Sequence, residues 1–423
     1  MKNLRMQQEM TDRGRLEIRV NTRIQARPVS GARVTVSYTG DPQNVIEELI
    51  TDGDGRTETL DLATPPLEYS LEPNVNQPYS EYTVKVEAEG YEPVEVTGSE
   101  LLSGEQSVQQ VDLKLAEGAA FADVTIPDHT LFGEYPAKIP ESEIKPTRES
   151  GEIVLSRVVI PEYIIVHDGA PTDSTARDYY VRYRDYIKNV ACSEIYATWP
   201  DAAIQANILA IMSFTLNRVY TEWYRNKGYD FTITSSTAYD HKWIYGRNIF
   251  DSISLVVDEI FADYLSRPNV KQPILTQYCD GNRVSCPNWM SQWGSKNLAD
   301  QGYSTIQILR NYYGDNMYIN TAEEISGIPS SWPGYDLTIG SSGNKVLQMQ
   351  EQLNVIAEVY SSIPTVYENG YFDEETQDAV EAFQRLFGLP VSGIVDYPTW
   401  YKSVDLCGCD EDCGAAVGIQ KSL

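Results

Sequence analysis

The sequence predicts a multidomain protein: an all-β sandwich first, a central α+β domain, and a small helical domain last. Three observations predict this fold class. Apolar and polar residues alternate at period two over residues 15–115. A long, almost wholly apolar helix follows near residue 200, and two amphipathic helical stripes recur within residues 336–403. The length of 423 residues also favours two or three domains.

Composition shifts give the domain boundaries. We expect a β-sandwich over 1–118, a linker over 119–152, a central domain over 153–333, a helical domain over 336–403, and an acidic tail over 404–423. The net charge is −28, and acids outnumber bases in every part of the chain. No basic stripe exists, so the sequence predicts no nucleic-acid partner.

The first residues, MKNLRMQQEMTDRGRLEI, lack an apolar stretch, and no long apolar run follows elsewhere. We therefore expect no signal peptide, no membrane span and synthesis in a cytoplasm. The central region is nearest to neutral and rich in tyrosine. Tyrosine presents a flat apolar face with a polar tip, which is common in carbohydrate and peptide grooves.

Strands in the N-terminal module are predicted from RLEIRV, ARVTVSY, YTVKVEAEG and QSVQQVDLKL, which are separated by turn sequences. The acidic DGDG at 52–55 predicts a hairpin turn, because the ligand series of a calcium-binding EF-hand is missing. The runs PVSGARVTV, TDGDGRTETLDL and YTVKVEAEGYEP resemble the carboxypeptidase-regulatory-like β-sandwich. That resemblance implies a structural module without chemistry of its own.

The linker over 119–152 is rich in Pro, Glu, Lys and Ser and shows no period, so we expect it to be exposed and cleavable. In the central domain, Ile204, Ile208 and Ile211 recur at helical spacing, and small alanines between them allow close packing. Because this helix is apolar almost all round, it should lie at the centre of its domain.

Glu194 stands alone before that helix, without another carboxylate close by in the sequence. It is either a solvated loop residue or an acid placed against apolar groups for chemistry. Desolvation would raise the pKa of such a carboxyl toward neutral, where it can act first as an acid and then as a base. The residues alone leave both interpretations open.

The C-terminal unit resembles the three-helix peptidoglycan-binding domain, which implies a glycan partner. The matching residues are Gly343, Val346, Gln350, Leu353, Gly370, Phe372, Asp373, Thr376, Ala379, Val380, Phe383, Gln384, Gly388, Leu389, Gly393, Thr399 and Trp400.

The central domain resembles the stage II sporulation protein D (SpoIID) family over roughly residues 160–320. The residues in register are Glu194, Trp199, Pro200, Ala203, Ala206, Ala210, Leu216, Tyr245, Gly246, Ser291, Gln292, Trp293, Gly294, Leu298, Ala299, Gly302, Tyr303, Ile308, Leu309, Tyr312, Tyr313 and Gly314. Two departures are Met212, where the family usually has Arg, and a shortened CDGNRVSCPNW stretch.

This resemblance implies a lytic transglycosylase with Glu194 as its catalytic residue. It also places Ser291 and Gln292 in the groove as hydrogen-bond partners, and Tyr278 and Trp293 as candidates to stack on sugar rings, with core packing as the rival role. The order of the three parts resembles the spore cortex-lytic enzymes. That implies a zymogen made in the mother-cell cytoplasm, stored at the spore cortex, and activated during germination by a subtilisin-like protease. The activating cut is predicted between about Glu149 and Val158.

Other functions stay open at this stage. A zinc amidase needs several histidines, and with His129 in the linker only His167 and His241 remain. A Cys–His peptidase could pair Cys192 with His241. A glycoside hydrolase would need a second acid, for which Asp240 and Asp280 are the first candidates. A non-catalytic cortex-binding protein is the alternative from another class.

Six cysteines are too few and too unevenly spaced for a disulfide scaffold. Cys279 and Cys286 flank a short loop, and a zinc site, a disulfide and free thiols are all open for this pair. Cys407, Cys409 and Cys413 lie in the acidic tail without a nearby histidine, so a flexible tail is favoured over a metal site. The sequence therefore predicts no cofactor.

Overall fold

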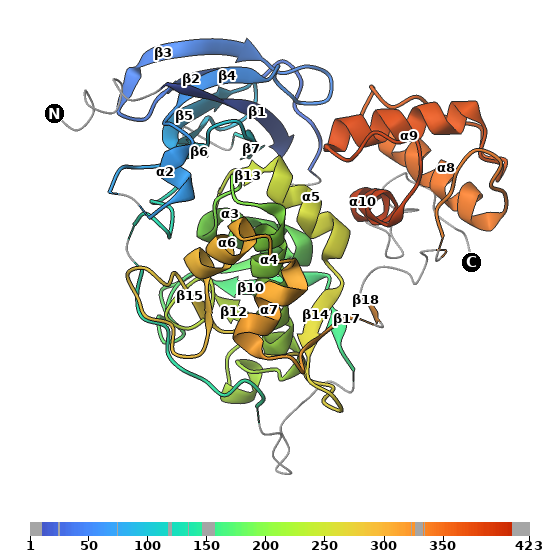
Figure 1. Ribbon diagram of the computed structural model, residues 1–423. Coiled ribbons are helices and arrows are strands. Elements are labelled where there is room, and N and C mark those ends of the chain that lie inside the picture. The colour runs from blue at the N-terminus through green and yellow to red at the C-terminus, as the bar shows by residue number, and fades with distance from the viewer. Residues whose placement is uncertain are drawn as a thin grey trace.

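The computed structural model describes residues 11–407, apart from 24–25, 74, 117–120, 134, 146–156, 323, 326–332 and 334. A β-module lies against one end of a central α+β domain, and a small helical unit packs beside both (Figure 1). The predicted activating cut falls almost entirely on residues outside the described part. The same is true of the tail from residue 408 onward, including Cys409 and Cys413.

The β-module contains two sheets. One has the order β13-β7-β1-β4 and the other β3-β2-β5-β6-β8. The strands are β1 (Asp12–Thr22), β2 (Arg33–Tyr38), β3 (Asp41–Ile50), β4 (Leu60–Thr64), β5 (Ser80–Glu87), β6 (Val94–Leu101), β7 (Gln106–Leu113) and β8 (Ala122–Thr125), with a short helix α2 (Glu68–Leu71). Alternate residues such as Ile18, Val34 and Val84 are fully buried and build one core. The alternation in the sequence thus corresponds to the inward faces of the two sheets.

The predicted hairpin turn at 52–55 is present. One carboxylate oxygen of Asp52 accepts hydrogen bonds of 2.9 Å from the backbone N–H groups of Asp54 and Arg56. Gly55 has a φ of +72° and its backbone lies against Val20, so a side chain there would clash. The acidic run therefore forms a turn whose carboxylate serves its own backbone.

Two strands of the module come from outside residues 1–118. β8 belongs to the predicted linker and pairs in parallel with β6. β13 (Ile249–Phe250) belongs to the central region and pairs with β7. Strands of four and two residues carry too short a pattern to be recognised in sequence, and their pairing depends on which sheet edges come near them.

The central domain is built around α4 (Asp201–Tyr220), which is buried along nearly its whole length. The helices packed on it include α3 (Tyr183–Glu194), α5 (Asp251–Ile260), α6 (Gln292–Asp300) and α7 (Thr305–Tyr313). Short strands complete the domain: β9 (Val159–Ile160), β10 (Tyr163–His167), β11 (Asp178–Arg182), β12 (Ile233–Thr234), β14 (Asp263–Ser266), β15 (Tyr278–Cys279), β16 (Met290–Ser291), β17 (Tyr318–Thr321) and β18 (Glu324–Ile325). The central position of α4 is the one its all-round apolar surface predicts.

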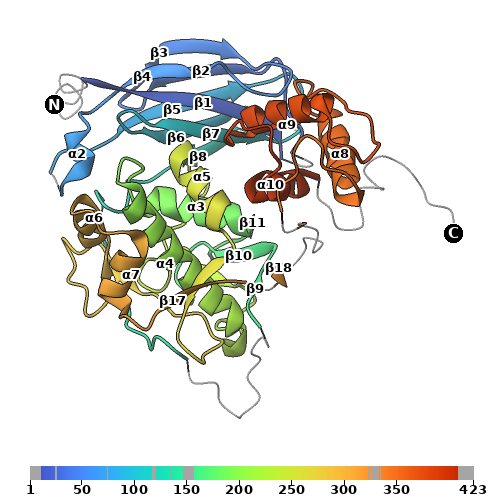
Figure 2. The same ribbon diagram turned by 45° about the vertical axis from the view of Figure 1, so that its right-hand side comes forward.

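The C-terminal unit consists of α8 (Asn344–Ala357), α9 (Glu374–Phe387) and α10 (Tyr397–Cys407). Figure 2 shows these helices beside the β-module and α5. Two buried glutamines play the same role twice. Gln350 accepts from the N–H of Gly370 (2.8 Å) and donates to Thr376 (3.1 Å), while Gln384 accepts from Gly393 (2.9 Å) and donates to Thr399 (3.0 Å). Each glutamine fastens the loop that leads into the next helix.

Candidate active site

Glu194 is the last residue of α3, and its side chain is buried, with 1% of the residue exposed. The helix stops there because Ile195 adopts an extended conformation. One carboxylate oxygen accepts a 2.6 Å hydrogen bond from the backbone N–H of Lys242, and the other accepts a 3.3 Å bond from the side-chain amide of Gln292. The carboxyl group is therefore held in one orientation from two sides.

Burial raises the pKa of Glu194 above that of an ordinary glutamate. The positive charge of Lys138, the N–H of Lys242 and the neighbouring Tyr278 and Gln292 oppose this shift without cancelling it. Desolvation thus dominates, and it favours the protonated form at higher pH than in water. A carboxyl group in this state can donate a proton and later accept one.

Two of the four predicted substrate-binding residues lie at Glu194. Gln292 begins α6 and donates to the carboxylate, while its own carbonyl oxygen has no hydrogen-bond partner. Tyr278 lies near enough to influence the pKa of Glu194, but its buried hydroxyl makes no aligned hydrogen bond. Its ring stacks on His241, with centroids 5.9 Å apart and planes 11° from parallel. The Gln292 carbonyl oxygen and the Tyr278 hydroxyl are thus buried polar atoms in the surroundings of Glu194.

The other two residues have structural contacts. The Ser291 hydroxyl accepts a 2.8 Å bond from the N–H of Gly294 and so caps α6. Trp293 is 5% exposed and packs against Trp199, with centroids 4.9 Å apart. In this arrangement both side chains support the helix that carries Gln292, and their role as substrate contacts stays a prediction.

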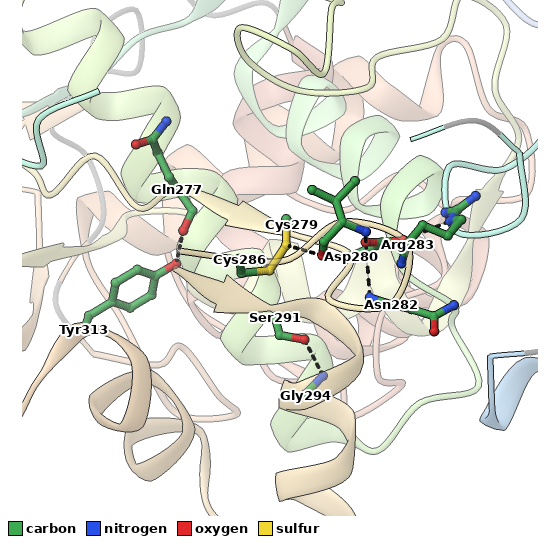
Figure 3. Close-up of a disulfide and its surroundings, with 10 residues drawn as sticks. Gln277, Cys279, Asp280, Asn282, Arg283, Cys286, Ser291, Gly294 and Tyr313 are labelled. Atoms are coloured by element: carbon green, nitrogen blue, oxygen red, sulfur yellow. Dashed lines mark hydrogen bonds and ion pairs between the residues drawn. A yellow bond between two sulfur atoms is a disulfide. The ribbon is translucent and has the colours of Figure 1, made fainter. Parts of the chain in front are cut away.

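Cys279 and Cys286 are joined by a disulfide, with Cα atoms 5.6 Å apart (Figure 3). Of the three states open from the sequence, the structure therefore has the disulfide, and the pair offers no thiolates to zinc. The bridge closes the loop between β15, which carries Tyr278, and β16, which leads to Gln292. It constrains the segment that brings both residues to Glu194.

Asp240 and Asp280, the candidates for a second acid, are both engaged elsewhere. One oxygen of Asp240 pairs with Arg218 at 2.7 Å, and the other accepts from Tyr224 (2.6 Å) and from the N–H and hydroxyl of Thr234 (2.9 and 2.7 Å). Asp280 accepts from the backbone and side chain of Arg283 and shapes the disulfide loop (Figure 3). Neither carboxylate is presented to activate a water molecule.

The residues that a zinc amidase or a Cys–His peptidase would need are not arranged as a site among the described residues. Within the described ranges, no three His, Cys, Asp or Glu side chains are grouped so that they could hold a metal ion. His167 is bonded to Asp178 at 2.8 Å, far along the chain from the loop that carries His241. Burial raises the pKa of Cys192 to about 12, which disfavours the thiolate that a peptidase requires.

A segment that the sequence reads as exposed linker lies over the site. This covering segment comprises residues 126–145, of which only residue 134 is undescribed. It runs along the central domain on the side of Glu194 and Arg283, and it is hydrogen-bonded to that domain over most of its length. Tyr135 and Lys138 are 8% and 5% exposed, and the charge of Glu194 influences the pKa of both. Sequence reasoning missed these residues because prolines disrupt any period; the apolar Leu131 and Tyr135 were the available signal.

The β-module is hydrogen-bonded to the central domain near the C-terminal end of α3. Arg247 forms two hydrogen bonds of 2.7 and 2.5 Å to the carboxylate of Glu100 on β6, and a third of 2.6 Å to the carbonyl of Cys192. The Asn248 side chain accepts a hydrogen bond from the backbone N–H of Glu100 and donates one to its backbone carbonyl. The module is thereby connected to the helix end and to the loop that position Glu194.

The part of the chain that the structure describes contains no helix with the length and apolarity to cross a membrane. No curated protein matches the chain. Some solved structures match locally with low overall similarity, each with a TM-score below 0.2. They include the Bacillus anthracis TIE protein (18% identity, TM-score 0.18, 25% of this chain and 17% of that chain). The minor pilin of Streptococcus agalactiae has 12% identity and a TM-score of 0.18. The match covers 28% of this chain and 49% of the pilin chain. Klebsiella pneumoniae 5-hydroxyisourate hydrolase has 14% identity and a TM-score of 0.17. The match covers 25% of this chain and 98% of the hydrolase chain.

The chain thus spans less than half the length of the first two structures, and these matches carry no functional argument.

A family model for a peptidoglycan binding domain matches residues 342–402. Its span contains α8, α9 and α10 and both loop-fastening glutamines. The C-terminal unit is therefore a peptidoglycan-binding domain, which associates this protein with the cell wall.

Proposed function

We propose that this protein is the stored precursor of a spore cortex-lytic enzyme that cleaves peptidoglycan by lytic transglycosylation. The observation that carries the proposal is Glu194: one buried carboxyl group, oriented by Lys242 and Gln292, with its pKa raised by burial. Resemblance of the central domain to the SpoIID family, and of the whole order of parts to cortex-lytic enzymes of the SleC type, supports the assignment of substrate and setting.

The proposed reaction uses the same carboxyl group twice. Glu194 gives its proton to the oxygen that links N-acetylmuramic acid to N-acetylglucosamine. The bond from the muramic acid C1 to that oxygen breaks, and the oxygen keeps the electron pair. The Glu194 carboxylate then takes the proton from the muramic acid 6-hydroxyl, whose oxygen bonds to C1 and closes a 1,6-anhydro ring. No water is consumed, which agrees with the engagement of Asp240 and Asp280 in other bonds.

The zymogen character is supported by the covering segment. Glu194 is buried in the intact chain, and Tyr135 and Lys138 of the covering segment lie close enough for its charge to influence their pKa values. A cut between about Glu149 and Val158 by a subtilisin-like protease would free the C-terminal end of that segment. We place the protein at the spore cortex, deposited there from the mother cell.

Replacing Glu194 by Gln tests the catalytic role. The amide keeps the size and the contacts of the carboxyl group but has no transferable proton, so cortex lysis should fall by about 10²–10⁴-fold. Glu259→Gln, an exposed position on α5, is the matched control. Mass spectrometry of the released fragments should show ends lighter by one water than hydrolysis products. Near-normal lysis by Glu194→Gln, or ordinary reducing ends, would reject the mechanism.

Removing residues 336–423 tests the anchoring role. Sedimentation with insoluble peptidoglycan should weaken on the order of 10²-fold, because a second linked binding site raises the local concentration of the first. Cleavage of soluble glycan by the cut protein should persist. Unchanged sedimentation would show that the C-terminal domain does not anchor the enzyme.

A further inference from the structure

Lys138 of the covering segment lies at the centre of the site. Its ammonium group donates a 2.7 Å hydrogen bond to the backbone carbonyl of Asp240. It also lies over two aromatic faces, 4.3 Å from the ring centroid of Tyr278 and 4.9 Å from that of Phe214. Both rings are almost fully buried. The Arg218 guanidinium also lies 4.8 Å from the Phe214 centroid, but its charge is paired with Asp240 and Glu141. One carbonyl oxygen and two ring faces thus contact the ammonium group next to Glu194.

This setting differs from that of the other buried lysines. Lys188 pairs directly with the carboxylate of Asp258 and Lys296 with that of Asp300, each at 2.7 Å, and Lys145 pairs with that of Glu141. Among the described residues, Lys138 has no carboxylate within ion-pair distance. Burial lowers its pKa to about 8, and the charge of Glu194 opposes that shift. A buried ammonium group is costly for folding unless its surroundings compensate it. Here the compensation comes from the Asp240 carbonyl, the two rings and the charge of Glu194, and not from a paired carboxylate.

The same surroundings suit a particular stage of glycosidic cleavage. When the bond to the leaving oxygen breaks, positive charge develops on C1 and the ring oxygen of the sugar. Aromatic faces and carbonyl oxygens that are already oriented stabilise such a charge without reorganisation. Glu194, which must deliver the proton at that moment, is adjacent. The ammonium group therefore occupies a position whose electrostatics match those of the transition state.

We propose that Tyr278, Phe214 and the Asp240 carbonyl form the subsite that stabilises the cationic sugar ring, and that Lys138 fills this subsite as an internal inhibitor. The proposal rests on the proposed function and adds to it the charge-stabilising subsite and the residue that blocks it. Withdrawal of the covering segment removes the ammonium group and leaves its position to the sugar.

The contacts of the covering segment permit its withdrawal from the site. The covering segment is held by separate hydrogen bonds, such as Ile139 N–H to the Ala238 carbonyl (2.8 Å) and Glu141 N–H to the Gln277 side chain (3.0 Å). Its described residues contribute no strand to the sheets of the central domain. Such a segment can detach locally without global unfolding.

The test uses the full chain with a specific protease site placed within residues 149–156, so that one cut can be made at will. Lys138→Met keeps an unbranched apolar side chain, one atom shorter, and removes the charge. Lys85→Met, which removes a positive charge from strand β5 outside the covering segment, is the control. The uncut Lys138→Met chain should cleave soluble glycan at least about tenfold faster than the uncut wild type, because the covered state loses stability relative to the open one. Uncut Lys85→Met should stay close to wild type.

A charged probe addresses the subsite itself. Ethylammonium should inhibit the Lys138→Met chain, whereas ethanol at the same concentration should not, because only the cation matches the two rings and the carbonyl. Equal effects of both compounds would contradict a cation subsite.

A third measurement does not depend on the variant. Lys138 in the wild type should resist acylation before the cut and react after it, as read by mass spectrometry of its peptide. The inference fails if Lys138 still resists acylation while glycan cleavage appears. It also fails if the uncut Lys138→Met chain cleaves soluble glycan no faster than the uncut wild type. If the cut wild type is itself inactive, the proposed function fails instead.

Discussion

The β-module and the covering segment both hold the central domain, but through different kinds of contact. The module joins it by strand pairing between β7 and β13 and by the Arg247–Glu100 pair, whose side chains are 0% and 1% exposed. The described residues of the covering segment form no strand there. Its Glu141 pairs with the buried Arg218, which has Asp240 as a second partner, and its ion pair from Glu143 to Arg267 is partly exposed. The first attachment therefore extends a sheet, whereas the second consists of separate hydrogen bonds and ion pairs.

This difference separates two roles that a prosegment can have. Loss of the β-module would leave Arg247 buried without its carboxylate, and an uncompensated buried charge is strongly destabilising. Loss of the covering segment would expose Glu194 and its neighbours without breaking a sheet. We therefore expect the module to support folding and the segment to impose inhibition, and the following predictions test that division.

The largest effect should come from removing the module altogether. A chain that begins at residue 157 lacks β7 and Glu100, so we expect it to be insoluble or inactive. Adding residues 1–150 as a separate chain during refolding should restore solubility and glycan cleavage. Soluble, active protein from residue 157 alone would show that the module has no folding role.

A smaller effect should follow from Glu100→Gln, which leaves the charge of Arg247 unpaired. We expect a loss of about 3–5 kcal/mol in the free energy of unfolding, measured by urea denaturation. Glu95→Gln is the matched control on the same strand, β6, at a position that is not fully buried. Replacing Glu100 and Arg247 together by Leu and Met should recover much of the loss. A change under about 1 kcal/mol for Glu100→Gln would match an exposed pair and contradict the comparison.

The mildest effect concerns Glu141 in the covering segment. Although burial opposes it, Arg218 and Lys145 lower the pKa of Glu141 to about 2. A carboxyl group with a depressed pKa stabilises the docked segment fully above its unfolded value, and this contribution is lost as the pH falls toward 2. Pepsin should therefore cut within residues 126–145 increasingly between pH 4.5 and 2. Glu141→Gln should weaken that dependence, and an unchanged profile would show that this pair does not secure the segment.

Much of the C-terminal domain follows from local sequence. The stripes of Val346, Met349 and Leu353 and of Ala379, Val380 and Phe383 are the buried faces of α8 and α9. Glycines with positive φ at Gly370 and Gly393 stand where the turns need them. Such features depend on residues three to twenty positions apart, so a single sequence contains the information.

The site was less accessible to prediction. Glu194 was identifiable as a lone acid beside an apolar helix, and Gln292 and Tyr278 entered through a family resemblance. Lys138, Arg247 and Glu100 were not anticipated. Their partners lie about 100 or more residues away, as in the contact from Lys138 to Asp240 and from Arg247 to Glu100. From sequence alone, a charged residue in a polar stretch is predicted to be exposed to solvent. Its burial depends on a partner that only the tertiary structure brings near.

By itself the sequence determined where the apolar faces lie: the two β-sheet interiors, the central helix α4 and the helical bundle at the C-terminus. Periodicity specifies burial on an element's own faces, because it depends only on backbone geometry. The tertiary structure alone decided that residues 126–145 cover Glu194, that β13 completes a sheet of the β-module, and that Asp240 is engaged by Arg218. These are contacts between distant segments, whose free energy depends on which surfaces meet and how completely water is excluded between them.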